Sequence, residues 1–296
     1  MKLKEYLLEK RAIVDRALEN YLPEMTGPKE ELYKAMRYSL FAGGKRLRPI
    51  LCIASAEAVG GSYEDVIPVA CAFEMIHTYS LIHDDLPAMD DDELRRGKPT
   101  NHVVFGEAMA VLAGDGLLTE AFRVMADPRL LEKAGSEKFR KVIEMVASAS
   151  GAGGMVAGQA LDIRAEGKKI DTSLMEIIHE NKTGALLRAS VTTGAILGGG
   201  SEKAIESLDS YGKNIGLAFQ ISDDILDIEG DTKEMGKQAG ADIERGKNTY
   251  PSIYGMEKSK IMLKEIIDNA IDMLFAFKDK AEPLRQIAVY IIERKK

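Results

Sequence analysis

The stretch Ser80-Leu-Ile-His-Asp-Asp-Leu-Pro-Ala-Met-Asp-Asp-Asp-Glu-Leu-Arg-Arg96 gathers six carboxylates within ten residues and ends in two arginines. Apolar residues at helical spacing precede it, so we expect a buried helix that ends at Asp84 and Asp85 and that Pro87 prevents from continuing. Each carboxylate raises the cost of ionising its neighbours. The acidic group therefore either faces water, which is the usual case for a charge run, or binds cations.

A second acidic segment lies between Phe219 and Asp227. Its polar residues follow a spacing of i, i+3, i+4 and i+7, which places them on one face of a helix; they are Gln220, Asp223, Asp224 and Asp227. Mg²⁺ prefers oxygen ligands and usually binds through one or two carboxylates plus substrate phosphates. We interpret the two acidic segments as two walls of one metal site that holds a diphosphate.

Composition favours helices throughout. The chain has 296 residues, of which 45% are hydrophobic and only 6% aromatic, and it has no Trp. Ala, Leu, Ile, Met, Glu and Lys are abundant, and all of them favour helices more than strands. No segment alternates apolar and polar residues over the length of a convincing strand, and no periodic repeat is present. The sequence predicts an all-α fold, a helical bundle that forms a single domain over residues 1–296.

Charge and cysteine usage exclude several classes of protein. The 47 acidic and 40 basic side chains give a net charge of −7. Without a basic stripe, nucleic acid is not an expected partner. Cys52 and Cys71 lie in apolar helical segments and are expected to be unpaired and buried, as in a reducing compartment. The N-terminal segment lacks a signal-peptide core, and no apolar run approaches the roughly 20 residues of a membrane helix. We expect a cytoplasmic protein without membrane insertion.

Basic residues follow a glycine pair in Gly43-Gly-Lys-Arg-Leu-Arg-Pro49. Flexible backbone there can let Lys45 and Arg48 converge on a phosphate. A helix–helix turn with solvated bases is an equally good interpretation of this segment by itself. His77 precedes Asp84 by seven residues and so lies on nearly the same helical face. That position favours a functional role over the structural role usual for a helical histidine.

Three further segments are candidates for the site. A predicted helix over residues 176–197 is interrupted at Asn181-Lys-Thr-Gly184, where glycine costs about 1 kcal/mol relative to alanine. Either the helix kinks there and frees carbonyls to face a positive charge, or it tolerates the glycine. Gln159 and Asp162 share one helical face. The polar, Gly- and Lys-rich residues 229–249 are interpreted as a mobile lid with lysines that can reach a phosphate.

Together these motifs resemble the trans-isoprenyl diphosphate synthases, the polyprenyl synthetase family, and among them bacterial farnesyl diphosphate synthases in particular. The resemblance covers essentially the whole chain, including Lys247-Asn-Thr-Tyr-Pro251. It implies a helical bundle around a deep central cavity, usually a homodimer. It also implies that isopentenyl diphosphate is condensed with dimethylallyl or geranyl diphosphate to give farnesyl diphosphate. Geranylgeranyl diphosphate synthase is the alternative within the family.

The resemblance also assigns roles to residues. Three Mg²⁺ ions would lie at the aspartate-rich motifs, two on Asp84 and Asp90 and one on Asp223, with further candidate ligands at Asp85, Asp224 and Asp227. The allylic diphosphate and its ionisation would involve Arg95, Lys182, Thr183, Gln220, Lys237 and Lys247. Isopentenyl diphosphate would bind Lys45, Arg48, His77 and Arg96. Product length would depend on Tyr79 and Ser80. The diphosphate would leave an allylic carbocation that the isopentenyl double bond attacks, so no side-chain nucleophile is assigned.

Two alternatives belong to other classes. A class I terpene cyclase also ionises an allylic diphosphate with Mg²⁺, but it does not need the predicted isopentenyl group of Lys45, Arg48 and His77. A non-catalytic partner subunit of a prenyl synthase is expected to have lost metal ligands, whereas both aspartate-rich motifs are intact.

Overall fold

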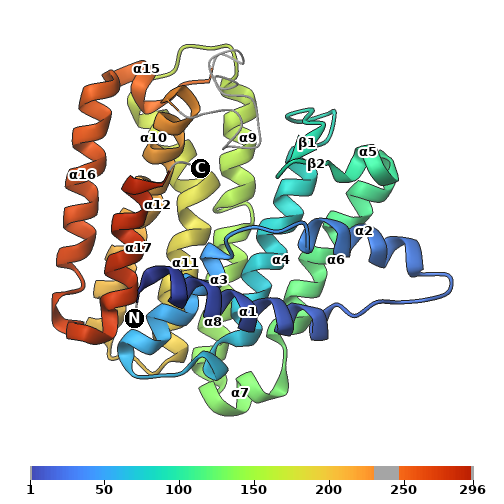
Figure 1. Cartoon of the computed structure of the whole chain (residues 1–296), viewed down its shortest axis with the longest axis horizontal. Helices are drawn as coiled ribbons and strands as arrows, with labels where there is room; N and C mark the ends of the chain where they lie inside the picture. The colour runs from blue at the N-terminus through green and yellow to red at the C-terminus, as the bar shows by residue number, and fades with distance from the viewer. Residues whose placement is uncertain (1, 230–246, 295–296) are drawn as a thin grey trace. The chain divides into compact units, whose positions relative to one another are not determined.

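The computed structural model describes residues 2–229 and 247–294, and helices dominate these residues (Figure 1). Their strands are β1 (Leu94–Arg95) and β2 (Lys98–Pro99), an antiparallel hairpin in which Leu94 pairs with Pro99 and Arg95 with Lys98. The all-α prediction is confirmed. In the described part of the chain, no helix has the length and apolar character needed to cross a membrane. The cellular location stays a prediction.

The chain divides into two compact units. The first comprises the described residues up to Ile50 together with Val66–Ser136. The second comprises Leu51–Asp65 and the described residues from Glu137 onward. Helix α3 (Leu47–Val59) begins in the first unit and ends in the second. The predicted single domain over residues 1–296 stays a prediction.

The first unit is built on helix α4, which is apolar along its length. Almost every residue from Pro68 to Ile82 is buried, and Pro68 lies in the first turn, where its missing N–H costs nothing. Helix α4 packs chiefly against α6 and runs beside it (Figure 1). The helices of this unit, apart from the start of α3, are α1 (Leu3–Tyr21), α2 (Glu30–Leu40), α4 (Ile67–Asp84), α5 (Asn101–Phe105), α6 (Glu107–Met125) and α7 (Pro128–Ala134).

The second unit is built on the long helix α12, which packs against α11 and α16. Its elements after α3 are η1 (Tyr63–Asp65), α8 (Ser136–Ser150), α9 (Met155–Ala165), α10 (Thr172–His179), η2 (Glu180–Gly184), α11 (Ala185–Leu197), α12 (Glu202–Glu229), α15 (Tyr250–Tyr254), α16 (Met256–Asp272), η3 (Phe275–Ala281) and α17 (Glu282–Glu293). The glycine-rich turn before α12 ends at Ser201, whose hydroxyl accepts from the Ala204 N–H.

The predicted interruption at residues 181–184 is a π-helical turn, η2, between α10 and α11. Such turns insert an extra residue into the helix and are frequent at functional sites. Glycines let two neighbouring helices approach it closely: a Cβ on Gly158 of α9 would lie 2.2 Å from the Lys182 nitrogen, and one on Gly216 of α12 would lie 2.8 Å from the Gly184 Cα. Lys182 and Thr183 are thus held where α9 and α12 both approach η2.

Candidate active site

The first acidic segment begins where α4 ends. The helix stops at Asp84, and the following loop folds back so that the Asp90 N–H donates to the Asp84 carbonyl oxygen at 2.8 Å. The backbone of Asp90 thus lies beside the end of α4, next to Asp84. Asp91 adopts a positive φ of 51° in this loop, a conformation that aspartate tolerates better than most residues.

Asp85, unlike the half-buried Asp84, is fully buried, and it is paired with Arg95. The Arg95 Nε donates to both carboxylate oxygens of Asp85, at 2.7 and 2.9 Å, and only 3% of Asp85 is exposed. Burial raises the pKa of the Asp85 carboxyl, while the Arg95 guanidinium opposes that rise. The pair fixes strand β1 to the end of α4. The predicted roles of Asp85 in metal binding and of Arg95 in diphosphate binding stay predictions.

Arg46 ties the glycine-pair loop to the core of the first unit. Its guanidinium donates to Asp15 Oδ1 and to Glu74 Oε1, both at 2.8 Å, and to the Leu40 carbonyl at 2.8 Å. A buried arginine needs such partners on every side, because an unpaired buried charge is very costly. Arg46 is therefore a structural anchor, and the solvated-turn interpretation does not hold for it.

Four arginines of the first unit act on His77. Burial, together with the positive charges of Arg48, Arg96, Arg95 and Arg46, lowers the pKa of His77 well below its ordinary value. Its imidazole is therefore neutral near pH 7, with one donor and one acceptor nitrogen. The structure thus brings His77, Arg48 and Arg96 of the predicted isopentenyl group together.

The glycine pair makes room for Arg96. A Cβ on Gly44 would lie 2.7 Å from the Arg96 Cζ, and Arg96 Nη1 donates to the Gly43 carbonyl. Lys45, on the same loop, is exposed. The close approach explains why glycine, with φ of +120°, occupies position 44.

Tyr79 lies on α4 and is only 6% exposed. Burial, and secondarily the charge of Asp84, raises the pKa of Tyr79 to about 12. Its ring meets His83 edge to face at 5.7 Å between centroids, and His83 Nε2 lies 3.1 Å from the Val111 carbonyl oxygen of α6. Gly114 of α6 leaves space for the His83 ring, because a Cβ there would lie 2.1 Å from Nε2. Ser80, the second predicted product-length residue, donates from Oγ to the His77 carbonyl at 2.9 Å.

The three aspartates of the second acidic segment have different surroundings. Asp223 keeps 46% of its side chain exposed and accepts at 2.6 Å from Arg294, which follows α17. Asp224 and Asp227 are 2% and 4% exposed. The sequence did not indicate Arg294, which is 71 residues away and becomes a neighbour only through the packing of α17 on α12.

A chain of hydrogen bonds runs through Asp224. The Thr183 Oγ1 donates to Gln220 Oε1 at 3.0 Å, and Gln220 Nε2 donates to Asp224 Oδ1 at 2.8 Å. The Tyr250 backbone N–H donates to Asp224 Oδ2 at 2.9 Å. The structure thus joins two predicted site residues, Thr183 and Gln220, and connects them to the start of α15.

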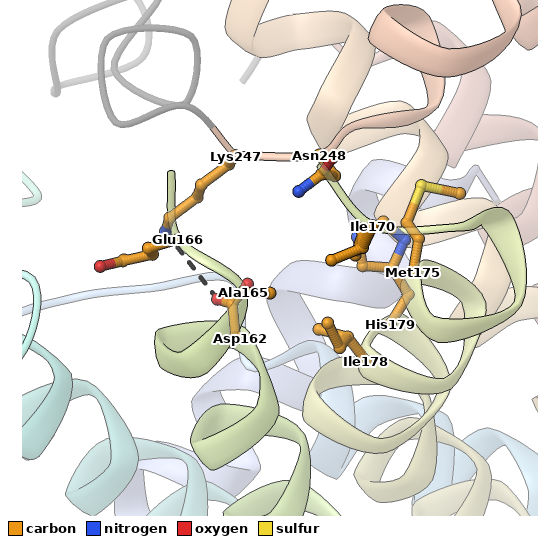
Figure 2. A pocket seen from close by; sticks show the side chains of 9 residues that line it. All are labelled: Asp162, Ala165, Glu166, Ile170, Met175, Ile178, His179, Lys247 and Asn248. Carbon is orange, nitrogen blue, oxygen red and sulfur yellow. Dashed lines mark ion pairs between the residues drawn. The ribbon is translucent and has the colours of Figure 1, made fainter. Parts of the chain in front are cut away.

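Asp162 contacts Lys182 and Lys247, two of the lysines predicted to bind the allylic diphosphate. Its Oδ2 lies 2.6 Å from the Lys182 Nζ and 4.0 Å from the Lys247 Nζ; Figure 2 draws the second pair as a dashed line. Burial opposes ionisation of Asp162, but Lys182, Lys247 and His179 together lower the pKa of its carboxyl. Lys237 and most of the predicted lid, residues 230–246, lie outside the described residues.

Gln159, on the same helix as Asp162, has an amide nitrogen and an amide oxygen that are both buried and that have no hydrogen-bond partner among the described residues. A buried amide without partners is unusual and points to a ligand or an ordered water. This observation strengthens a candidate that the sequence indicated only by spacing.

The carboxylates fit a cation that a substrate helps to bind. Among the described residues, no three His, Cys, Asp or Glu side chains are grouped as a metal site would require. Partly exposed Asp223, and Asp90 beside Asp84, nevertheless offer hard oxygen ligands. Mg²⁺ commonly takes only one or two carboxylates and completes its shell with water and phosphate oxygens. The donors of each unit, taken separately, fit Mg²⁺ together with a diphosphate better than a cage made by protein alone.

Comparisons with known proteins identify the class. The chain matches a structure of an FPP/GFPP synthase from Zymomonas mobilis with a TM-score of 0.87 and 38% identity, covering 98% of both chains. It is 49% identical over 270 residues to the farnesyl diphosphate synthase of Geobacillus stearothermophilus, covering 91% of this chain and 90% of the relative. It is also 49% identical over 293 residues to the chloroplastic heterodimeric geranylgeranyl pyrophosphate synthase large subunit 1 of Arabidopsis thaliana, covering 98% of this chain and 78% of the relative.

The fold is therefore that of the isoprenoid synthases, an all-α class of protein. Residues 29–286 match the polyprenyl synthetase family model, and the chain belongs to that family. It is a trans-prenyltransferase of isoprenoid biosynthesis.

The lowered pKa of Asp162 predicts a pH-dependent contribution to stability. A carboxyl whose folded pKa lies below its unfolded value stabilises the fold above about pH 4, and this contribution disappears as pH falls through the folded pKa. We expect Asp162→Asn to lower Tm by a constant amount from pH 5 to 7, and the gap to close below about pH 4. Thermal unfolding by circular dichroism measures both.

Exposed Glu166, one helical turn further along the chain, provides the matched control. Glu166→Gln is expected to leave Tm within about 1 °C of the unmodified protein at every pH, since surface substitutions have small effects. A gap between Asp162→Asn and the unmodified protein that persists unchanged at pH 3 would contradict an ionic role for Asp162.

Proposed function

We propose that the protein is a farnesyl diphosphate synthase that condenses isopentenyl diphosphate first with dimethylallyl diphosphate and then with geranyl diphosphate. The observation that carries the proposal is the arrangement along α4, where neutral His77 among arginines, buried Tyr79 and the acidic end at Asp84 follow one another within eight residues. The family supports the type of reaction, and the farnesyl diphosphate synthase of Geobacillus stearothermophilus supports the product.

Each group of residues has a role in this proposal. Asp84, Asp90 and Asp223 would hold Mg²⁺, which when bound neutralises the diphosphate leaving group. Lys182 and Lys247, together with Arg95, bind the allylic diphosphate in a fixed orientation; Lys237 is proposed to join them. Arg48, Arg96 and Lys45 bind isopentenyl diphosphate, and His77 can donate a hydrogen bond to it without adding charge.

Thr183 and Gln220 are proposed to face the allylic carbon where positive charge develops. Hydroxyl and amide oxygens carry negative dipole ends, which stabilise a cation without forming a bond to it. The isopentenyl double bond then attacks the cation, and the proton lost from the product is taken up by the released diphosphate. The residues around the reacting carbons are thus needed for binding and orientation, and none acts as a nucleophile.

A geranylgeranyl diphosphate synthase is the second candidate, because the identity to the Arabidopsis relative is also 49%.

A homodimer is proposed as the assembly, and light scattering of the purified protein would measure its mass.

Incubation of the protein with labelled isopentenyl diphosphate and Mg²⁺ tests the function. Dimethylallyl, geranyl and farnesyl diphosphates are supplied in separate reactions, and the dephosphorylated products are separated by chromatography. We expect farnesol from the two shorter primers and no extension of farnesyl diphosphate. Geranylgeraniol as the main product would replace the farnesyl assignment, and an absence of condensation with every primer would contradict the proposed function.

Removal of a proposed metal ligand is expected to abolish most turnover. Asp84→Ala and Asp223→Ala should each reduce kcat by at least about 100-fold, because charge on the leaving group is no longer neutralised. Asp268→Ala, which removes an exposed aspartate on α16, is the control and should retain full activity. Near-normal turnover in a folded Asp84 or Asp223 variant would show that its carboxylate does not hold a required ion.

Tyr79 is expected to limit product length. It lies five residues before Asp84, which corresponds to about 7.5 Å along the helix. Tyr79→Ala should remove the obstacle and give products of 20 carbons or more, whereas Tyr79→Phe keeps the ring and should still give farnesol. Identical product profiles for the two variants would exclude Tyr79 as the determinant.

A further inference from the structure

Asp223 and Asp224 are adjacent in sequence but differ in environment. Asp223 is partly exposed and accepts one hydrogen bond, from the buried guanidinium of Arg294. Asp224 is 2% exposed, and each of its oxygens accepts from a donor of the protein, Gln220 Nε2 and the Tyr250 backbone N–H. The Tyr250 N–H is itself buried and needs this acceptor, since an unsatisfied buried amide is costly.

The hydrogen bonds of Asp224 determine the direction of those beyond it. Both Asp224 oxygens act as acceptors, so the Gln220 amide turns its NH₂ group toward Asp224 and its oxygen toward Thr183. The Thr183 hydroxyl has a single proton, and it donates that proton to the Gln220 oxygen. Only the lone pairs of the Thr183 oxygen are then left for a group in the site.

We propose that Asp224 is a positioning residue that sets the polarity of Thr183 toward the substrate, and that it does so through the amide of Gln220. The inference rests on the proposed function, in which Thr183 and Gln220 face a developing carbocation. A hydroxyl that presents lone pairs stabilises such a cation, whereas one that presents its proton destabilises it. Asp224 therefore acts on catalysis without touching the substrate, and of this adjacent pair Asp223 is the metal ligand.

The same carboxylate also supports residues that bind diphosphate in the proposal. The Tyr250 N–H on Asp224 fixes the start of α15, three residues after Lys247. Asn248 Nδ2 donates to the Lys168 carbonyl at 3.0 Å, and Lys247 lies 4.0 Å from Asp162 (Figure 2). The stacked rings of Tyr250 and Tyr254, 5.8 Å apart, and the adjacent ring of His179 pack around this start of α15. Asp224 thus links Thr183, Gln220 and the segment that carries Lys247.

Asp224→Asn is the informative substitution. The Tyr250 N–H belongs to the backbone and cannot be reversed, so the new amide must turn its oxygen toward Tyr250 and its NH₂ group toward Gln220. The Gln220 amide then flips, and its NH₂ group faces Thr183. The Thr183 hydroxyl accepts that bond and turns its own proton elsewhere. The substitution keeps the volume and the bond to Tyr250 but reverses the dipoles beyond Asp224.

The first readout separates positioning from metal binding. Steady-state kinetics with dimethylallyl and isopentenyl diphosphates should show kcat reduced about 100-fold in Asp224→Asn, with both KM values within threefold of the unmodified enzyme. Mn²⁺ binding in the presence of inorganic diphosphate, followed by electron paramagnetic resonance, should be unchanged. The neighbouring variant Asp223→Asn is the matched control, and it should weaken Mn²⁺ binding at least tenfold.

The second readout tests the route through Thr183. Thr183→Val removes the hydroxyl at nearly constant volume, and its kcat should fall about as far as that of Asp224→Asn. The double variant should be no slower than either single variant, because both changes remove the same interaction. If Asp224→Asn does not fold, Gln220→Met takes its place in the cycle with Thr183→Val, since it breaks the same hydrogen bonds and leaves Asp224 on Tyr250.

Three results would overturn the inference. The first is Mn²⁺ binding in Asp224→Asn that is weakened as much as in Asp223→Asn. The second is an increase in KM of Asp224→Asn with kcat unchanged. The third is a double variant whose fold-reduction in kcat equals the product of the two single reductions. Failure of the proposed function has a different signature, because the unmodified protein would then show no condensation in the assay with the three primers.

Discussion

Repulsion between neighbouring carboxylates is the constraint on which the rest of this structure depends. Each acidic segment places aspartates side by side, which low-dielectric surroundings make costly. In both segments one carboxylate is buried and accepts hydrogen bonds from the protein, while the adjacent aspartate is partly exposed. The Arg95 guanidinium donates to Asp85 at the end of α4. Gln220 and the Tyr250 N–H donate to Asp224 on α12. Arg95 lies ten residues after Asp85 and Tyr250 lies 26 residues after Asp224, so these hydrogen bonds fix β1 to the end of α4 and the start of α15 to α12.

Basic side chains of the protein are likewise held by oppositely charged partners. Three carboxylates, Asp15, Glu74 and Asp162, hold basic side chains in defined places: the first two fix Arg46, and Asp162 holds Lys182 and Lys247. Burial, and secondarily the positive charges of the surrounding arginines, lowers the pKa of His77 and so favours its neutral imidazole. A diphosphate that binds such preformed groups loses little free energy to their rearrangement, which is the general advantage of preorganisation. Glycines at positions 44, 158 and 216 complete this arrangement because they permit close approach.

Much of the fold followed from local pattern. Continuous apolar sequence before Asp84 predicted a buried helix, and α4 is buried from Pro68 to Ile82 except at His77, Ser80 and Leu81. The sequence around Gly184 left a kink and a tolerated glycine equally open, and the chain forms the π-helical turn η2 there. Helical spacing placed Gln220 and Asp224 on one face, and they are hydrogen-bonded to each other. These features depend on residues within a few turns, so periodicity and glycine chemistry suffice to predict them.

The sequence by itself determined the fold class, the helix ends that carry aspartates and the residue types of the site, because each depends on side chains close along the chain. Only the tertiary structure decided which hydrogen-bond partner each of those side chains has. Three aspartates at helical spacing are equivalent in sequence, yet packing of α17 brings Arg294 to Asp223, and the start of α15 brings a backbone N–H to Asp224. Those partners are 71 and 26 residues distant. A local sequence pattern does not predict which distant donor contacts a given carboxylate, because that contact depends on how whole helices pack.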